Sequence, residues 1–185
     1  MEMRRKEKMI SREEILEVLA SAEYGILSTV SADGMPYGTP VNFVYADDAI
    51  YFHCATEGHK LSNLAANNNV CFTAVDSVEL MPEKFNTKFR SVIAFGKASA
   101  VEDDEEKKKA LLEIIKKLSP DFIESGIAYI NSSFSKAEVI KITISEISCK
   151  ATRESPGLGS SMTLSPTSPQ SHGDPEEPRR FLIPQ

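Results

Sequence analysis

Apolar and polar residues alternate along much of the first 150 residues, which is the pattern of strands with one buried face. Short turn sequences, such as ADG at 32–34 and ADD at 46–48, separate the alternating segments. The alternation predicts six strands, of which the first three form a meander with short connections. The expected strands are residues 25–31, 36–45, 49–53, 70–78, 91–101 and 137–150.

Other segments repeat their apolar positions with the period of a helix. Ser11 and Glu14 have the spacing of a capping box at the start of the first such segment. Another begins with four acidic residues and ends with Lys116 and Lys117, the arrangement that a helix dipole favours. The expected helices are residues 11–22, 61–67 and 103–118, and the stretches 79–87 and after Pro120 are expected to be irregular.

The order of these elements shows no alternation of strands and helices of the kind that builds parallel sheets. It predicts a mainly β fold with helical additions, an antiparallel barrel formed by residues 1–155. Composition changes near Ser155, and residues 156–185 hold six of the ten prolines together with many serines. We expect this tail to be disordered, because it cannot bury enough apolar surface to offset its ordering entropy. A docking segment around Pro166 and Pro169 is the alternative.

Charge and cysteine content narrow the functional classes. A net charge of −6 disfavours nucleic acid as a partner. No apolar run reaches the length of a membrane helix, and the charged first residues lack the apolar stretch of a signal peptide. Cys54, Cys71 and Cys149 are far apart with no CxxC pair, which disfavours a disulfide framework or a zinc site. We therefore expect a cytoplasmic protein that binds no membrane and no metal.

One segment carries candidate chemistry. Residues 51–60, YFHCATEGHK, run from a strand end through a turn into the start of a helix. Free backbone N–H groups and the positive end of a helix dipole suit a phosphate at such a place, and His59 and Lys60 add donors. From the residues alone, a solvated basic helix start explains the segment equally well.

Three stretches together resemble a known family. PYGTPVNFVY, IYFHCATEGHKLSNLAANNNVCF and FRSVIAFGKASAVEDDEEKKKALLEII are similar to the FMN-binding split-barrel superfamily of pyridoxamine 5'-phosphate oxidase-like proteins, in particular its nitroimidazole-resistance (Nim) branch. The resemblance covers residues 3–153. It implies an antiparallel six-stranded split β-barrel, a homodimer with FMN at the subunit interface, and transfer of electrons to a small-molecule acceptor such as a nitro compound.

The resemblance also implies cofactor contacts from several places along the chain. Strand two and the end of strand three would contact the flavin, a helix start would hold the phosphate, and strand five would also reach the cofactor. The implied residues are Thr39, Pro40, Val41 and Asn42; His53, Cys54 and Ala55; His59 and Lys60; and Arg90 or Ser91. Thr39 and Val44 replace basic residues of true pyridoxamine phosphate oxidases, and the chain has no Trp for their C-terminal substrate motif, which disfavours vitamin B6 oxidation.

His53 is the candidate catalytic residue. Ala49, Tyr51 and His53 share one strand face, which we expect to look toward a cleft near the strand's end. An imidazole there could donate a proton as electrons leave the flavin, or it could only pack beside the ring. Two other readings stay open: a haem-binding barrel with His53 or His59 as axial ligand, and a non-catalytic flavin-binding protein.

Overall fold

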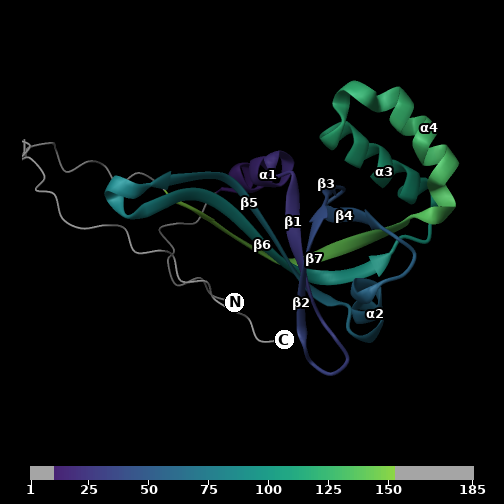
Figure 1. Ribbon diagram of the computed structural model, residues 1–185, viewed down its shortest axis with the longest axis horizontal. Coiled ribbons are helices and arrows are strands. Elements are labelled where there is room, and N and C mark those ends of the chain that lie inside the picture. The colour runs from purple at the N-terminus through teal and green to yellow at the C-terminus, as the bar shows by residue number, and fades with distance from the viewer. Residues whose placement is uncertain (1–10, 153–185) are drawn as a thin grey trace, which may run out of the picture. The chain divides into compact units, whose positions relative to one another are not determined.

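The structure, a computed structural model, describes residues 11–152, and the expected tail at 156–185 lies outside them. The described chain forms one antiparallel sheet of seven strands in the order β2-β1-β5-β6-β7-β4-β3, with helices packed against it (Figure 1). The mainly β fold with helical additions is confirmed, but the number of strands exceeds the expected six. The strands are β1 Tyr24–Val30, β2 Pro36–Asn42, β3 Val44–Ala46, β4 Ala49–Cys54, β5 Asn69–Met81, β6 Asn86–Ala100 and β7 Glu138–Ala151. The α-helices are α1 Arg12–Ser21, α2 His59–Ala66, α3 Asp104–Leu118 and α4 Ile123–Ser133.

Phe43 accounts for the seventh strand. The expected strand 36–45 is two strands, since β2 ends at Asn42 and β3 begins at Val44. These two strands are the opposite edges of the sheet, so a single residue between them brings the edges together. The expected three-strand meander is therefore confirmed only in part. The first half of the expected strand pairs with β1 and its second half with β4, both antiparallel, but the two halves lie at opposite ends of the sheet, and β4 joins the sheet through β7. Alternation continues across Phe43, so the pattern could not reveal the change of partner.

The sheet has a core on each of its two faces near β4. Inside the barrel, Ile50 and Phe52 pack with Phe72. On the other face, Ala49 and Tyr51 pack against α3 and α4. Because β4 is buried on both faces, its register is fixed from both sides.

Strands β5 and β6 continue far beyond the barrel as one long hairpin, which extends away from the rest of the sheet (Figure 1). The expected irregular stretch 79–87 is wrong: pairing runs to Met81 and Asn86, with a register shift after Asp76 and a 3-10 turn at the tip. The bulge, at which Ser77 has a φ of 56°, breaks the alternation that strand prediction relies on.

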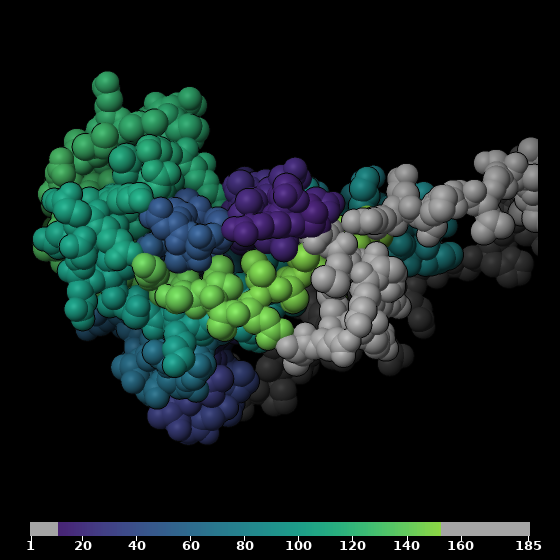
Figure 2. Space-filling view, turned by 180° about the vertical axis from the view of Figure 1, so that it is seen from behind, coloured from purple at the N-terminus to yellow at the C-terminus, as the bar shows by residue number. Residues whose placement is uncertain are grey.

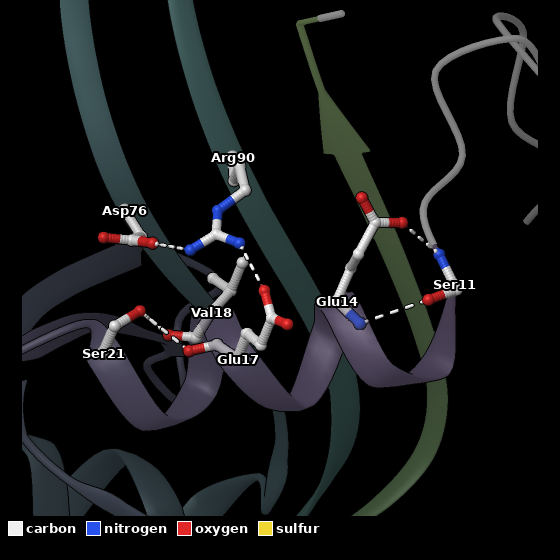
Figure 3. Close-up of polar contacts among 7 residues, drawn as sticks. All are labelled: Ser11, Glu14, Glu17, Val18, Ser21, Asp76 and Arg90. Carbon is white, nitrogen blue, oxygen red and sulfur yellow. Dashed lines mark hydrogen bonds and ion pairs between the residues drawn. The ribbon is translucent and has the colours of Figure 1, made fainter.

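Local signals at the helix ends are confirmed. The Glu14 N–H donates to Ser11 Oγ at 3.2 Å, and the Ser11 N–H donates to Glu14 Oε2 at 2.8 Å (Figure 3). Asp103 caps α3 through the Glu106 N–H at 2.7 Å.

Helix α4 lies in the segment after Pro120, which was expected to be irregular. No side chain caps its start, so it lacks the signal that marks α1. It packs closely on α3 at Gly126, where a Cβ would lie 2.7 Å from the Ile115 side chain. A larger residue at this crossing would require the Ile115 side chain to move.

Arg90 joins α1 to the base of the long hairpin. Its guanidinium donates to Glu17 on α1 at 2.8 Å and to Asp76 on β5 (Figure 3). Burial acts to raise the pKa of Asp76, but the hydrogen bonds from Arg90, Ser77 and Ser21, together with the charge of Arg90, outweigh burial and lower the pKa.

Lys117 ties three elements together at the join between β2 and β3. Its Nζ donates to the Leu19 carbonyl at 2.9 Å and lies 3.7 Å from the centre of the Phe43 ring. Figure 2 shows α1 in purple beside the β3–β4 hairpin in blue, with α3 and α4 in green beyond them. Burial lowers the pKa of Lys117 to about 8.

Lys117 gives folding a defined pH dependence. Its pKa is about 8 in the folded chain against 10.5 for an exposed lysine, so between these values the folded state binds fewer protons than the unfolded state. The cost of burying the charge is fully present below pH 8 and disappears as the pH rises. The free energy of unfolding should therefore increase from about pH 8 to 10, as measured by urea unfolding.

The increase should be smaller in Lys117→Met. Lys116→Met is the matched control, because Lys116 is exposed and pairs with Glu113 at 2.7 Å. Equal pH dependence in both variants would contradict the assignment to Lys117.

Candidate functional site

The start of α2 is fixed against β1 and β2. Buried Asn63 donates to Thr29 Oγ1 at 3.0 Å, and Thr29 Oγ1 donates to the Tyr37 carbonyl at 3.3 Å. The rings of Tyr37 and His59 meet edge to face with centroids 4.6 Å apart. These contacts bring the predicted phosphate residues beside the strand predicted to line the flavin.

The N-terminus of α2 carries no side-chain cap. Gly58 precedes it with a φ of 136°, in the region that glycine adopts at least cost, and its carbonyl accepts the N–H groups of Leu61 and Ser62. The N–H groups of His59 and Lys60, which precede these two donors, are thus left to an external acceptor, which makes the turn suitable for an anion.

Lys60 links this helix start to the end of β4. Burial raises the pKa of Cys54, and the charge of Lys60 opposes that rise, which places the ammonium within electrostatic reach of the strand end. The raised pKa keeps Cys54 a thiol at neutral pH. Cys54 is therefore suited to contact and not to nucleophilic chemistry.

The four predicted residues of β2 do not share one environment. Thr39 and Val41 are half-buried, and Val41 packs on the barrel core, whereas Pro40 and Asn42 are exposed. The Asn42 amide donates to the Glu23 carbonyl at 2.9 Å, so it already has a structural partner. Pro40 is tolerated because β2 is an edge strand, where a missing N–H breaks no inner ladder.

His53 is exposed near the end of β4, on the face it shares with Tyr51. It lines a cavity of about 380 Å³ between the strand end and the α3–α4 hairpin, together with Cys54 and Ala55. The expectation that this face looks into a cleft is confirmed.

The structure does not bring Arg90 or Ser91 to this place. Arg90 is paired with Glu17 and Asp76. The end of β6 that lies near His53 is the one next to Val101, because Val101 donates its N–H to Val139, the residue paired with His53. Ser91 lies ten residues before Val101 along the chain, a separation of about 33 Å for an extended strand.

Sequence reasoning missed two groups of residues at the site. Thr29 and Asn63 anchor α2, and nothing in the sequence sets Asn63 apart from the other polar residues of this short helix. The other group lines the cavity from α4 and the turn after it, including Tyr129, Ser133 and Lys136. It was missed because α4 itself was not expected.

Comparison with known proteins identifies the family. The family model for pyridoxamine 5'-phosphate oxidase (Pyridox_ox_2) matches residues 11–151, and no curated protein matches the chain. No helix in the described part of the chain is long and apolar enough to span a membrane.

Several solved structures share the fold. A protein provisionally assigned to 5-nitroimidazole antibiotic resistance in Bacteroides thetaiotaomicron is 28% identical, with a TM-score of 0.65 over 77% of this chain and 85% of that one. The flavocytochrome Anf3 from Azotobacter vinelandii is 22% identical, with a TM-score of 0.71 over 97% of this chain and 92% of that one. An FAD-binding protein from Mycobacterium smegmatis is 25% identical, with a TM-score of 0.51 over 78% of this chain and 99% of that one.

The match over residues 11–151 covers nearly all of the barrel, including the start of α2 and the end of β4. The chain belongs to the pyridoxamine 5'-phosphate oxidase family.

Proposed function

We propose that this protein is an FMN-dependent oxidoreductase that passes electrons to a small electron-poor acceptor, such as a nitro compound. The observation that carries the proposal is the uncapped start of α2, which follows the end of β4 after four residues, while that strand end lines the cavity at His53. A candidate anion-binding site and an apolar cavity thus both lie at the end of β4.

The residues present suit the phosphate of FMN. The first turn of α2 offers backbone donors, and Lys60 adds a positive charge. One helix start with two basic residues matches a single phosphate group, which favours FMN over a dinucleotide. Thr39 to Asn42 would flank the ring along the edge of β2.

The bound flavin would supply the electron transfer. The protein would supply orientation and a proton. His53 would hold that proton at an imidazole nitrogen facing the cavity, next to the acceptor. Cys54, kept as a thiol, would form part of the wall.

The functional unit we propose is a homodimer. Ser91 is too far from His53 for both to contact one flavin within a single chain. The long β5–β6 hairpin also exposes apolar side chains: Val78 is 62% exposed, Leu80 72% and Phe85 99%. An arm of this kind is stabilised when a second copy covers it.

Lys60 provides the test of the cofactor site. A charge-assisted contact with phosphate is worth about 1.5–3 kcal/mol, so Lys60→Ala should weaken FMN binding about tenfold to a hundredfold. Lys97→Ala, at an exposed lysine on β6, is the control and should bind FMN as the wild type does. Unchanged affinity in Lys60→Ala would put the phosphate elsewhere. A Soret band in place of flavin bands would favour the haem-binding alternative.

His53→Gln separates a catalytic from a structural role. Glutamine keeps polarity and approximate size but cannot deliver a proton. The variant should retain FMN and lose about a hundredfold or more in turnover per bound flavin, with a nitroimidazole and excess reductant. Turnover within about twofold of the wild type would make His53 a wall of the cavity. Absence of turnover in the wild type would favour a non-catalytic flavin-binding protein.

Light scattering tests the dimer. The wild type should have twice the chain mass of 20.4 kDa at micromolar concentration, and Phe85→Asp should shift it toward the monomer. Lys84→Asp, at the adjacent exposed position, is the control for added charge. A monomer that still binds FMN tightly would overturn the proposed interface.

A further inference from the structure

The cavity beside His53 has mainly apolar walls. Leu111 and Ile114 on α3 face Ile130 on α4 across it. Its volume of about 380 Å³ falls in the range of small-molecule sites. This space holds one substituted ring system and little more.

The polar groups of this cavity are few, and none of them is acidic. Two basic residues, His53 and Lys136, and two hydroxyl residues, Tyr129 and Ser133, line it. Lys107 adds positive charge behind one wall, with Nζ 4.6 Å from the centre of the Phe134 ring. Glu138, which pairs with Cys54 across the strands, is not among the lining residues, although its charge contributes to the raised pKa of the Cys54 thiol in the wall. A negative charge inside the cavity would therefore find cations and few competing carboxylates.

We propose that this cavity is the substrate pocket and that it selects an electron-poor aromatic carboxylic acid. The ring lies among Leu111, Ile114 and Ile130, and the carboxylate is directed toward Lys136 and His53. A dianionic phosphate ester fits less well, because one lysine and one histidine are the only basic side chains among the lining residues, and two hydroxyls add no charge to balance a second negative charge. The role as substrate pocket rests on the proposed function, whereas binding of the acid does not require the flavin.

Isothermal titration of the full-length protein tests the selectivity. The probes are 4-nitrobenzoate, nitrobenzene and 4-nitrophenyl phosphate. We expect 4-nitrobenzoate to bind at least about tenfold more tightly than either of the others. Lys136→Gln should reduce its advantage over nitrobenzene to about threefold or less. A preference for the phosphate ester, or no preference for the carboxylate, would overturn the proposed class.

Two neighbouring serines on α4 test the location. Ser133 lines the cavity, whereas Ser132 is exposed and does not. Ser133→Phe should weaken 4-nitrobenzoate binding at least about tenfold, and Ser132→Phe should leave it within about twofold of the wild type. If Ser133→Phe does not fold, Ala137→Leu narrows the same cavity from the start of β7.

The outcomes separate the pocket from the proposed function. Equal binding of 4-nitrobenzoate by the Ser132 and Ser133 variants would overturn the pocket. Dissociation of the dimer by Ser133→Phe alone would also overturn it, because the cavity would then belong to an interface between copies. Nitro reduction with an unchanged KM in Ser133→Phe would overturn the pocket and leave the oxidoreductase intact. Selective binding of 4-nitrobenzoate by a protein without flavin bands would support the pocket and overturn the proposed function.

Discussion

The structure depends on the join between β2 and β3. One residue, Phe43, connects strands at opposite edges of the sheet, so the sheet must curve until those edges meet. Its ring is fully buried and packs edge to face on Phe72, with centroids 4.8 Å apart. Closure brings the two edges of the sheet together and places β2 in contact with β4. The candidate flavin strand and the strand that carries His53 are neighbours for this reason.

A buried polar contact positions α2, the other element of the candidate site. The hydrogen bonds from Asn63 to Thr29 and from Thr29 to the Tyr37 carbonyl hold α2 in one orientation. A buried donor without its partner costs about 1–3 kcal/mol, so alternative positions of the helix are penalised. The basic start of α2 is thereby held in place, with the N–H groups of His59 and Lys60 available to a ligand.

Features that depend on residues close together in the sequence could be predicted, whereas features that depend on contacts between distant segments could not. The capping box at Ser11 and the charged ends of α3 are local, and both were predicted correctly. The change of partner at Phe43 and the bulge near Ser77 depend on strands distant in the sequence, and both were missed. Helix α4 depends on packing against α3 at Gly126 and has no capping signal of its own.

The candidate site divides in the same way. The face of His53 followed from simple alternation along β4, and the residues of the α2 start came from the family resemblance. Neither route could show that Arg90 is occupied by Glu17 and Asp76, because those partners come from α1 and β5. The cavity-lining residues of α4 could not be predicted, because the helix itself was not predicted.

The position of β7 in the sheet has a consequence for synthesis of the chain on the ribosome. β7 lies between β6 and β4, and it is the last strand of the described chain to be made. Until residues 138–151 emerge, β4 and β6 each present an open edge, and the two halves of the sheet share no ladder. Nascent chains are therefore exposed to edge-to-edge association until β7 has emerged, because only this strand joins the two halves of the sheet.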